Sequence, residues 1–201
     1  RQYMGADDLI NGKLRYCLWL KDCPHQLISS SPKLMQRLEE VAKVRRKSSK
    51  ELTRKWALKP QLFTEDRQPD SEYLMLPVVS SERRKYIPMA YNDSTIIANT
   101  NSQMIPNAPT YIFGVLTSLI HSVWMKAVCG RLEMRYAYSA SVVYNTFPFP
   151  SISSSKKSEI ENAAENILLV RAAYPEKTLA DLYDPDKMPQ DLREAHETLD
   201  T

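Results

Sequence analysis

Glu133 and Arg135 are the residues whose types and spacing suggest a specific chemistry. They lie in the stretch 130–144, in which apolar or aromatic residues occupy the even positions from Met134 onward and polar residues most of the odd ones from Glu133 onward. This alternation predicts a half-buried strand, on which residues i and i+2 share a face. Arginine can donate to O6 and N7 of guanine, and glutamate can accept from N4 of cytosine. The pair could therefore read one C·G base pair, although the residues alone favour an ordinary surface ion pair.

A second polar segment follows a predicted strand and combines hydroxyl groups with cations. Its residue types suit contacts to DNA phosphates, and the candidates are Ser80, Ser81, Arg83, Arg84 and Lys85. Asn101 lies in a polar loop after another predicted strand, and its amide could bond an adenine edge. A charged hairpin and an ordinary turn explain the same residues without DNA, so both alternatives stay open.

Positive charge is concentrated between Lys43 and Lys59, where eight basic residues accompany one acid. The net charge of the whole chain is only +3, because residues 151–201 carry 6 basic and 11 acidic side chains. A local basic segment indicates an anionic partner. Its candidate DNA-backbone contacts are Arg45, Arg46 and Lys47. On composition alone, a solvated helix face is an equal alternative.

The sequence lacks the motifs of common catalytic and cofactor sites. It has 4 glycines and 3 widely separated histidines, with no glycine-rich phosphate loop, no G-x-S-x-G motif and no zinc-ligand spacing. Asp70 and Glu82 loosely resemble a nuclease carboxylate pair, but Arg84 stands where that pattern requires lysine. We therefore expect no catalytic residue, no cofactor site and no metal site in this chain. Its 3 cysteines form no C-x-x-C pair and are expected to be reduced thiols.

Apolar runs and turn signals predict the elements of the N-terminal half. Strands are expected at residues 12–20, 73–79, 86–90 and 95–98. Ser31 followed by Pro32 is typical of a helix start. Helices are expected over 32–47 and 49–58, with a loop over 61–71. Turn residues between the short strands favour a small, mostly antiparallel sheet.

The C-terminal half is expected to be mostly helical. A long helix is predicted over 110–128, ended by Gly130 at a C′ position, and the strand 133–144 follows. Further helices are expected over 156–173, 179–183 and 190–199. These elements predict an α+β fold in which a small, mostly antiparallel sheet packs with helices and a helical C-terminal tail follows. The expected domains are residues 1–150 and 151–201.

Ordered blocks of residues carry a resemblance over nearly the whole chain. They are Tyr3-Met4-Gly5-Ala6-Asp7, Asn11-Gly12-Lys13-x-Arg15-Tyr16-Cys17-Leu18-Trp19-Leu20, Ser80-Ser81-Glu82-Arg83-x-x-Tyr86-Ile87-Pro88, Phe113-Gly114-Val115-Leu116-Thr117-Ser118, Trp124-Met125-x-Ala127-Val128-Cys129-Gly130-Arg131-Leu132, Tyr138-Ser139, Val143-Tyr144-Asn145-Thr146-Phe147-Pro148-x-Pro150 and Leu179-Ala180-Asp181-Leu182-Tyr183-Asp184-Pro185. With these blocks in this order, the chain resembles the C-terminal part of the MmeI-like (type IIL) restriction–modification enzymes and related DNA adenine methyltransferases.

The resemblance implies a target-recognition domain followed by a C-terminal helical segment. In such enzymes another domain binds S-adenosylmethionine and methylates adenine N6, and some members add a nuclease. The positions that match Glu133 and Arg135 vary together in this family, as Glu with Arg or Lys with Asp, and select one base pair. The resemblance therefore makes these two residues the first candidates for base reading, with Asn101 near another specificity position. Some members use an arginine where this chain has Ala137, and that contact cannot be made here.

We therefore expect sequence-specific binding of double-stranded DNA for an S-adenosylmethionine-dependent N6-adenine methyltransferase. The chain begins at Arg1 and would be a piece of a longer protein, whose methyltransferase domain would hold the cofactor and the catalytic residues. No apolar run approaches the about 18 residues of a membrane span, so no membrane partner is expected. The resemblance implies a cytoplasmic location in a bacterium or archaeon. The alternative function is a protein–protein scaffold in which the acidic tail and an apolar helix dock another subunit and DNA contact is incidental.

Overall fold

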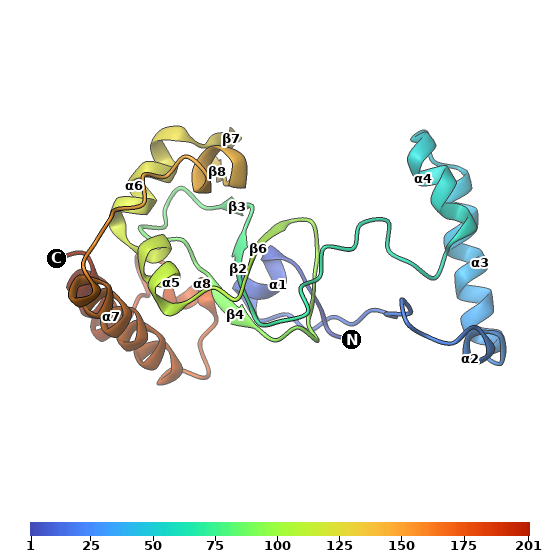
Figure 1. Ribbon diagram of the computed structural model, residues 1–201, viewed down its shortest axis with the longest axis horizontal. Coiled ribbons are helices and arrows are strands. Elements are labelled where there is room, and N and C mark those ends of the chain that lie inside the picture. The colour runs from blue at the N-terminus through green and yellow to red at the C-terminus, as the bar shows by residue number, and fades with distance from the viewer. The chain divides into compact units, whose positions relative to one another are not determined.

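The computed structural model describes residues 1–201 and divides into two compact units. The first unit contains Arg1 and Cys17–Gln68, and the second contains Gln2–Tyr16 and Pro69–Thr201. Figure 1 labels the elements of both units. The expected domain boundary near residue 150 does not coincide with this division, and it stays a prediction about the sequence.

The first unit is helical. Its elements are α2 (His25–Ser29), α3 (Pro32–Arg46), α4 (Glu51–Lys55) and the short 3-10 helix η1 (Trp56–Leu58). The Ser31 hydroxyl caps α3 by accepting a hydrogen bond from the Leu34 amide at 3.4 Å, and Pro32 occupies the first turn. Both helices predicted for this part of the chain are confirmed.

The strand predicted over residues 12–20 is wrong. This segment forms one isolated bridge, between Gln2 and Tyr16, and its side chains Leu14 and Leu18 are exposed. The chain passes from the second unit to the first within the segment, at Cys17. Apolar residues form a buried strand only where partner strands flank them, and here they connect two units instead.

The second unit contains three small sheets. β1 (Tyr3–Met4) pairs in parallel with β5 (Ile97–Ala98). The antiparallel sheets have the orders β4 (Ala90–Asn92), β2 (Tyr73–Pro77), β6 (Ser102–Pro106) and β3 (Val79–Ser80), β8 (Arg135–Ala137), β7 (Gly130–Leu132). The α+β fold class is confirmed. The strand expected over 86–90 begins only at Ala90, and β6 starts within the segment expected to be a polar loop.

The helices of the second unit surround these sheets. They are α1 (Ala6–Asn11), α5 (Thr110–Thr117), α6 (Leu119–Val128), the π-helix η2 (Ala140–Tyr144), α7 (Ser154–Ala172), α8 (Leu179–Leu182) and α9 (Gln190–Leu199). β2 is the centre of the core, because both of its faces are covered. Leu74 and Leu76 belong to the large hydrophobic cluster that includes α5, whereas Tyr73 and Met75 pack with α1. Burial on both faces explains why this strand is apolar throughout.

The long helix predicted over 110–128 is two helices, α5 and α6, which meet at 60°. Ser118 separates them, because its Oγ donates to the Val115 carbonyl at 2.7 Å and accepts from the His121 amide at 3.3 Å. After the break, the α6 side chains Ile120 and Val123 are 71% and 55% exposed, whereas Leu116 in α5 is buried. No single helix is long and apolar enough to cross a membrane, and only this bent pair reaches the required length and composition.

The end of α6 agrees with its prediction. α6 ends at Val128, and the extended Cys129 is its C-cap. Gly130 follows at the predicted C′ position and opens β7 with no positive φ.

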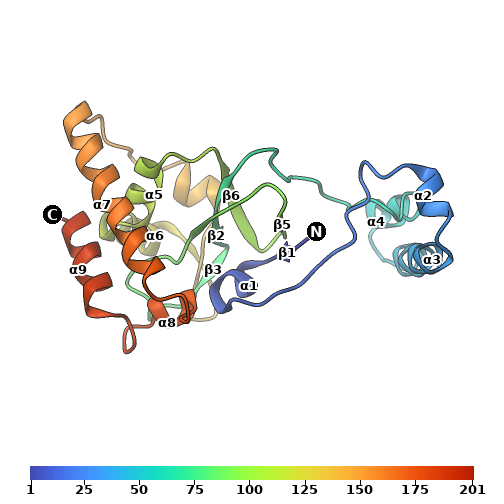
Figure 2. The same ribbon diagram turned by 90° about the horizontal axis from the view of Figure 1, so that it is seen from below.

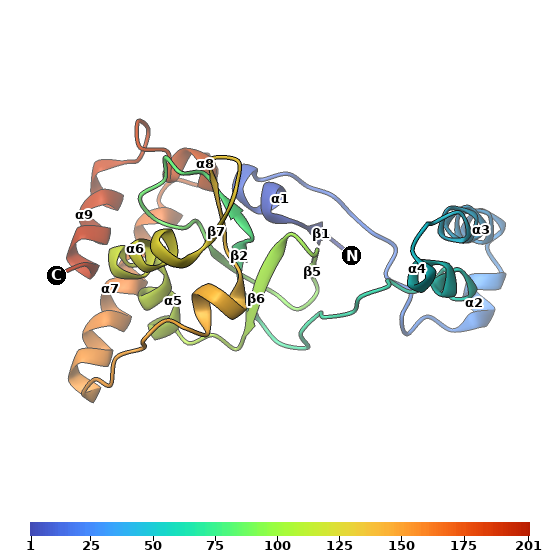
Figure 3. The ribbon, with the colours of Figure 1, turned by 90° about the horizontal axis from the view of Figure 1, so that it is seen from above.

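The C-terminal helical segment is confirmed and shares its core with the sheets. α7 packs against α5 and α9, as the views in Figure 2 and Figure 3 show. Gly114 permits the close approach of α5, because a Cβ there would lie 2.8 Å from Cγ2 of Ile160. Ala164, Ile167 and Leu192 are buried in the same cluster as β2. The helical tail is therefore part of the second unit rather than a separate compact body.

Candidate functional site

Glu133 and Arg135 lie at the tip of a hairpin rather than along one strand. β7 and β8 are joined by the two-residue turn Glu133-Met134, and Leu132 pairs with Arg135. Glu133 has a φ of 57°, in the left-handed region that favours glycine. The continuous strand predicted from Glu133 onward is therefore wrong, because the chain turns there and then forms η2 after β8.

The two side chains meet at this tip. Arg135 Nη2 donates to Glu133 Oε2 at 3.1 Å, and the two side chains are 48% and 79% exposed. An ion pair with such exposure contributes only about 0–1 kcal/mol to stability. A tight turn thus places the pair side by side on the surface, which the sequence analysis had attributed to strand periodicity.

The hairpin is fixed at its base. β8 pairs with β3, and the Tyr138 amide that follows β8 donates to the Val78 carbonyl at 2.6 Å. The buried Tyr138 hydroxyl lies 3.1 Å from Nε2 of His121 in α6. Nearer the tip, the Arg131 guanidinium lies 4.2 Å from the centre of the Tyr136 ring, within the range of a cation–π contact. A fixed base and an exposed charged tip suit recognition of a polar partner.

A polar cleft of about 500 Å³ is bordered by the hairpin, α1 with the chain after it, and the β3–β4 and β5–β6 loops. Its charged or hydrogen-bonding lining residues are Asp7, Asn11, Arg15, Ser81, Arg84, Asn99, Asn101 and Arg135. The structure thus brings together four residues that the sequence analysis had proposed separately: Ser81, Arg84, Asn101 and Arg135.

Asn101 is held in the cleft by Asn99. The backbone N–H of Asn101 donates to Asn99 Oδ1 at 2.8 Å, and the backbone N–H of Asn99 donates to the Met4 carbonyl at 2.9 Å. Gly5 permits this arrangement, because a Cβ at Gly5 would lie 2.1 Å from Asn99 Nδ2. In the sequence, the amide of Asn99, like that of Asn101, could bond an adenine edge or satisfy an ordinary turn.

Arg84 is the partly buried cation of the cleft. Its Nε is buried without a hydrogen-bond partner. Burial lowers the pKa of the Arg84 guanidinium, and the charge of Asp184 acts in the opposite direction. Arginine nevertheless remains charged in proteins. The cleft therefore contains a cation whose hydrogen-bonding capacity is not fully used.

The other residues of the predicted phosphate-binding segment do not line the cleft. Ser80 is buried in β3. Arg83 donates to Asp186 at 2.5 Å, and Lys85 Nζ lies 5.0 Å from the centre of the Tyr86 ring. Their role in binding DNA stays a prediction, and the geometry favours the two residues of this segment that do line the cleft.

The basic segment of the first unit contains cations of different kinds. Arg45 donates to three carbonyl oxygens at 2.8–3.0 Å, those of Trp56, Lys59 and Leu62. Arg46 pairs with Glu39 at 2.9 Å. Lys47 is exposed, with no hydrogen bond or ion pair from its side chain. Arg45 therefore holds its own unit together, and Lys47 is the better candidate for a phosphate contact.

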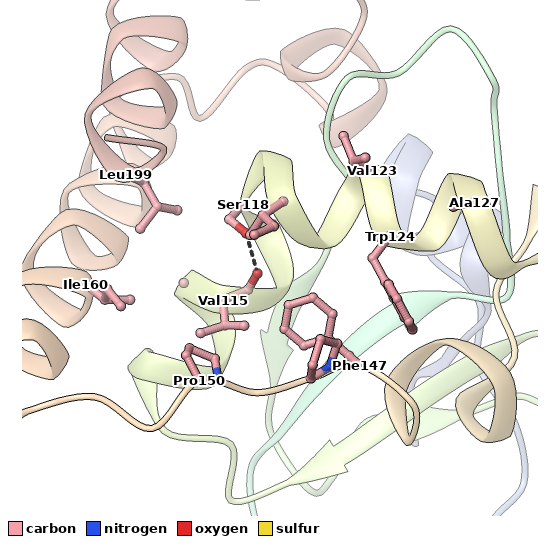
Figure 4. Close-up of a pocket in the computed structure, with 12 residues that line it drawn as sticks. Val115, Ser118, Val123, Trp124, Ala127, Phe147, Pro150, Ile160 and Leu199 are labelled. Atoms are coloured by element: carbon pink, nitrogen blue, oxygen red, sulfur yellow. Dashed lines mark hydrogen bonds between the residues drawn. The ribbon is translucent and has the colours of Figure 1, made fainter.

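A separate groove of about 430 Å³ is apolar (Figure 4). Trp124 and Phe147 form one part of its lining, and Val115, Ile160 and Leu199 form another. It includes the exposed α6 side chains of Ile120 and Val123 and no charged residue. None of the predicted site residues lies in it. The second unit therefore has two concave surfaces of opposite character.

Two family descriptions match the chain. Residues 1–151 match the family described as MmeI, target recognition domain, and residues 152–201 match the family described as MmeI, C-terminal domain. "DNA methyltransferase A" of Bacillus subtilis (strain 168) is 41% identical over 200 residues, which are 100% of this chain and 23% of that protein.

A solved structure of the Type IIL restriction-modification enzyme MmeI in complex with DNA has a TM-score of 0.98 and 44% sequence identity. The similarity covers 100% of this chain and 27% of the MmeI chain. This chain thus spans about a quarter of the length of either relative. The resemblance inferred from the ordered sequence blocks is confirmed. The chain belongs to the MmeI target recognition domain family over residues 1–151 and to the MmeI C-terminal domain family over residues 152–201.

Proposed function

We propose that this chain recognises a specific double-stranded DNA sequence for an S-adenosylmethionine-dependent N6-adenine methyltransferase of the restriction–modification type. The observation that carries the proposal is the Glu133–Arg135 pair at the tip of a fixed hairpin, beside a cleft rich in guanidinium and amide groups. Glutamate can accept a hydrogen bond from cytosine N4, and arginine can donate to guanine O6 and N7. The pair would read both halves of one C·G base pair.

The backbone strain at Glu133 exceeds what its ion pair contributes to stability, which supports a role of this side chain in binding. A non-glycine residue in the left-handed region costs on the order of 1 kcal/mol or more, and Glu133 occupies it. Its ion pair with Arg135 is too exposed to offset much of that cost. A glycine would suit the backbone better, so the Glu133 side chain is retained for a contact outside the folded chain.

Other residues would supply position and affinity. Ser81 and Arg84 would contact phosphates from the cleft, and Asn101 would bond a base edge. Exposed cations of the first unit, such as Lys47, would add affinity that falls as salt is raised. Arg45 and Arg46, whose side chains are engaged within the unit, would contribute less.

Catalysis would belong to the remainder of the protein. The relative from Bacillus subtilis is called a DNA methyltransferase, and this chain covers 23% of it. The 4 glycines of this chain build no glycine-rich loop for a cofactor, so S-adenosylmethionine would bind in another domain of the same protein. That domain would take the target adenine out of the stack before methylation. We propose a cytoplasmic location, where bacterial and archaeal chromosomes lie.

The test is an exchange of the pair in the full-length protein that contains this chain. The double variant Glu133→Lys with Arg135→Asp should switch one recognised position from C·G to G·C. Sequencing of methylated adenines in DNA from cells that express each variant gives the recognition sequence directly. Single substitutions should lose about 1–3 kcal/mol of discrimination at that position.

A matched control is available on α7, where Lys156 and Glu159 form another exposed pair at 2.8 Å. Exchanging these two residues with each other should leave the methylated sequence unchanged. If the double variant at the hairpin keeps the original sequence as well, the assignment of Glu133 and Arg135 is wrong.

A protein–protein scaffold is the second candidate function, and the apolar groove beside α6 favours it. A scaffold that docks an apolar partner there would bind duplex DNA only incidentally and would show no preference for one sequence. Titration of the full-length protein with duplexes of several sequences, at several salt concentrations, separates the two functions. Steep salt dependence together with preference for one sequence would exclude the scaffold as the main role.

A further inference from the structure

Arg15 is a guanidinium of the polar cleft to which the sequence analysis gave no role, and its conformation is fixed from within the fold. Its Nε donates to Asp8 Oδ1 at 2.8 Å, and its Nη2 donates to Asp8 Oδ2. The guanidinium also lies 5.2 Å from the centre of the Tyr3 ring. Gly12, with a φ of 63°, ends α1 and turns the chain so that Arg15 can reach back to this helix.

Asp8 is a rigid support for this arginine. Its side chain is 2% exposed, and its Oδ2 also accepts a hydrogen bond from the Gly5 amide at 2.7 Å. The hydrogen bonds from Arg15 hold the pKa of the Asp8 carboxyl below its usual value. Arg15 itself is 52% exposed. One edge of the guanidinium is thus occupied by a buried carboxylate, while Nη1 makes none of these hydrogen bonds.

More basic than acidic side chains line the cleft. Its lining contains Arg15, Arg84 and Arg135 with one acid, Asp7, whereas the acids paired with Arg15 and Arg135, Asp8 and Glu133, do not line it. The Asp7 carboxylate is already engaged, because it accepts from Lys13 Nζ at 2.6 Å and from Asn11 Nδ2 at 2.7 Å. A concave surface with three guanidinium groups, one of them held at a fixed angle, attracts an anion that accepts several hydrogen bonds.

We propose that Arg15, positioned by Asp8, binds a phosphodiester group of the DNA backbone and so fixes the register of the duplex beside the reading hairpin. This inference rests on the function proposed above and adds a residue to it. A phosphate is favoured over a base edge because Arg15 shares the cleft with Ser81 and Arg84, which offer the same chemistry. Arg135 and Asn101, which are proposed above to read bases, line the same cleft, so the test below distinguishes a phosphate contact from a base contact.

The test compares three variants of the full-length protein: Arg15→Gln, Arg15→Lys and Arg193→Gln. Arg193 lies in α9 and does not line the cleft, so it controls for the loss of one positive charge. Duplex affinity is measured between 50 and 200 mM salt, and methylated adenines are mapped for each variant. Thermal unfolding of each variant verifies that the fold is retained.

Arg15→Gln should bind the recognised duplex roughly five- to tenfold more weakly at 0.1 M salt and lower the slope of log affinity against log salt by about 1. Arg15→Lys keeps the charge, so its slope of log affinity against log salt should equal that of the unsubstituted protein. Its affinity should fall two- to threefold, because lysine lacks the planar guanidinium that Asp8 holds in place. The methylated sequence should be unchanged in both, and Arg193→Gln should match the unsubstituted protein.

Three outcomes would overturn the proposal. If Arg15→Gln changes the slope no more than Arg193→Gln does, Arg15 is no phosphate contact. If Arg15→Lys keeps the reduced slope of Arg15→Gln, the contact does not depend on charge. If Arg15→Gln methylates additional sequences, Arg15 reads a base instead. Failure of the unsubstituted protein to bind duplex DNA would refute the proposed function itself, and is distinguishable from all three.

Discussion

The Tyr138 hydroxyl lies 3.1 Å from Nε2 of His121, and this buried contact joins the base of the β7–β8 hairpin to α6. The same relationship recurs between Tyr183 and His196, also at 3.1 Å, where α8 meets α9. In both histidines Nδ1 is buried without a hydrogen-bond partner. A charged imidazole would therefore be poorly accommodated at either position.

We expect these two histidines to make the fold sensitive to acid. Burial lowers the pKa of His121 from 6.5 to about 4, and burial together with the charges of Arg171 and Lys85 lowers that of His196 to about 3. In the unfolded chain each histidine takes up a proton near pH 6.5. Their contribution to stability is thus present above pH 6.5 and is lost as the pH falls through 6.5 toward 4 and 3. For His121 the loss is on the order of 3 kcal/mol.

Denaturant unfolding of the chain at several pH values between 7 and 4 tests this expectation. His121→Gln has no titrating side chain at position 121, so the free energy of unfolding of this variant should fall less steeply as the pH is lowered from 7 to 4. The exposed His25, replaced in the same way, is the control and should leave the full pH dependence. A His121→Gln curve parallel to that of the unsubstituted chain would contradict the assignment.

The backbone of the hairpin tip gives a second prediction. Glu133 has a φ of 57°, whereas its neighbour in the turn, Met134, has no positive φ. Glu133→Gly should therefore raise the free energy of unfolding by about 1 kcal/mol, because glycine relieves the strain. Met134→Gly should lower it by roughly 0.5–1 kcal/mol, because glycine only adds freedom to the unfolded chain there.

Thermal unfolding of the two variants measures the difference, and opposite signs are required. If both substitutions destabilise the chain equally, Glu133 is not strained. In the full-length protein, Glu133→Gly should also lose discrimination at one base pair despite its greater stability.

Sequence patterns predicted the elements whose signals are local. Ser31 and Pro32 marked the start of α3, and the helix predicted over 156–173 corresponds to α7. The turn at Glu133 was missed because it contains neither glycine nor asparagine, so the alternation of residue types continued across it. The break at Ser118 was missed for a similar reason, since serine alone does not end a helix.

The sequence predicted individual residues of the candidate site but not their arrangement. Arg135, Arg84 and Asn101 were each identified by their chemistry, but no pattern indicated that they line one cleft. The role of Arg15 was not predicted, because it depends on a contact with Asp8 that the fold creates. Residue type reports what a side chain can do, whereas convergence of side chains depends on long-range packing.

Gly5 gives a third prediction, because its small size keeps Asn99 in place. A methyl group there would lie 2.1 Å from Asn99 Nδ2, so Gly5→Ala should displace the Asn99 side chain. Asn99 Oδ1 would then no longer accept the hydrogen bond from the Asn101 backbone N–H. We expect a loss of about 1–3 kcal/mol of stability. In Gly5→Ala with Asn99→Ala the clashing side chain is absent, so part of the stability should return.

Gly130→Ala is the control for this experiment, since no atom lies closer than 4.0 Å to a Cβ at that position. The free energies of unfolding of the two single variants and the double variant form a cycle. Additive effects of Gly5→Ala and Asn99→Ala would show that the two residues do not constrain each other.

The last prediction separates two neighbouring cations of the first unit. Arg45 donates to three carbonyl oxygens, whereas the Lys47 side chain is exposed and makes no such contact. Arg45→Met should destabilise the chain by about 2 kcal/mol, because three carbonyl groups, two of them in partly buried hydrogen bonds, lose a charged donor. Lys47→Met should change stability by less than about 0.5 kcal/mol, yet should lower the salt dependence of duplex binding by the full-length protein.

Denaturant unfolding measures the stability of both variants, and duplex titration at several salt concentrations measures the salt dependence of their DNA binding. If Arg45→Met unfolds like the unsubstituted chain and reduces the salt dependence, Arg45 is a DNA contact and its hydrogen bonds to the carbonyl groups are incidental. If Lys47→Met leaves the salt dependence unchanged, the exposed cation next to Arg46 does not meet the phosphate backbone. The contrast matters because composition alone gave all three residues the same role.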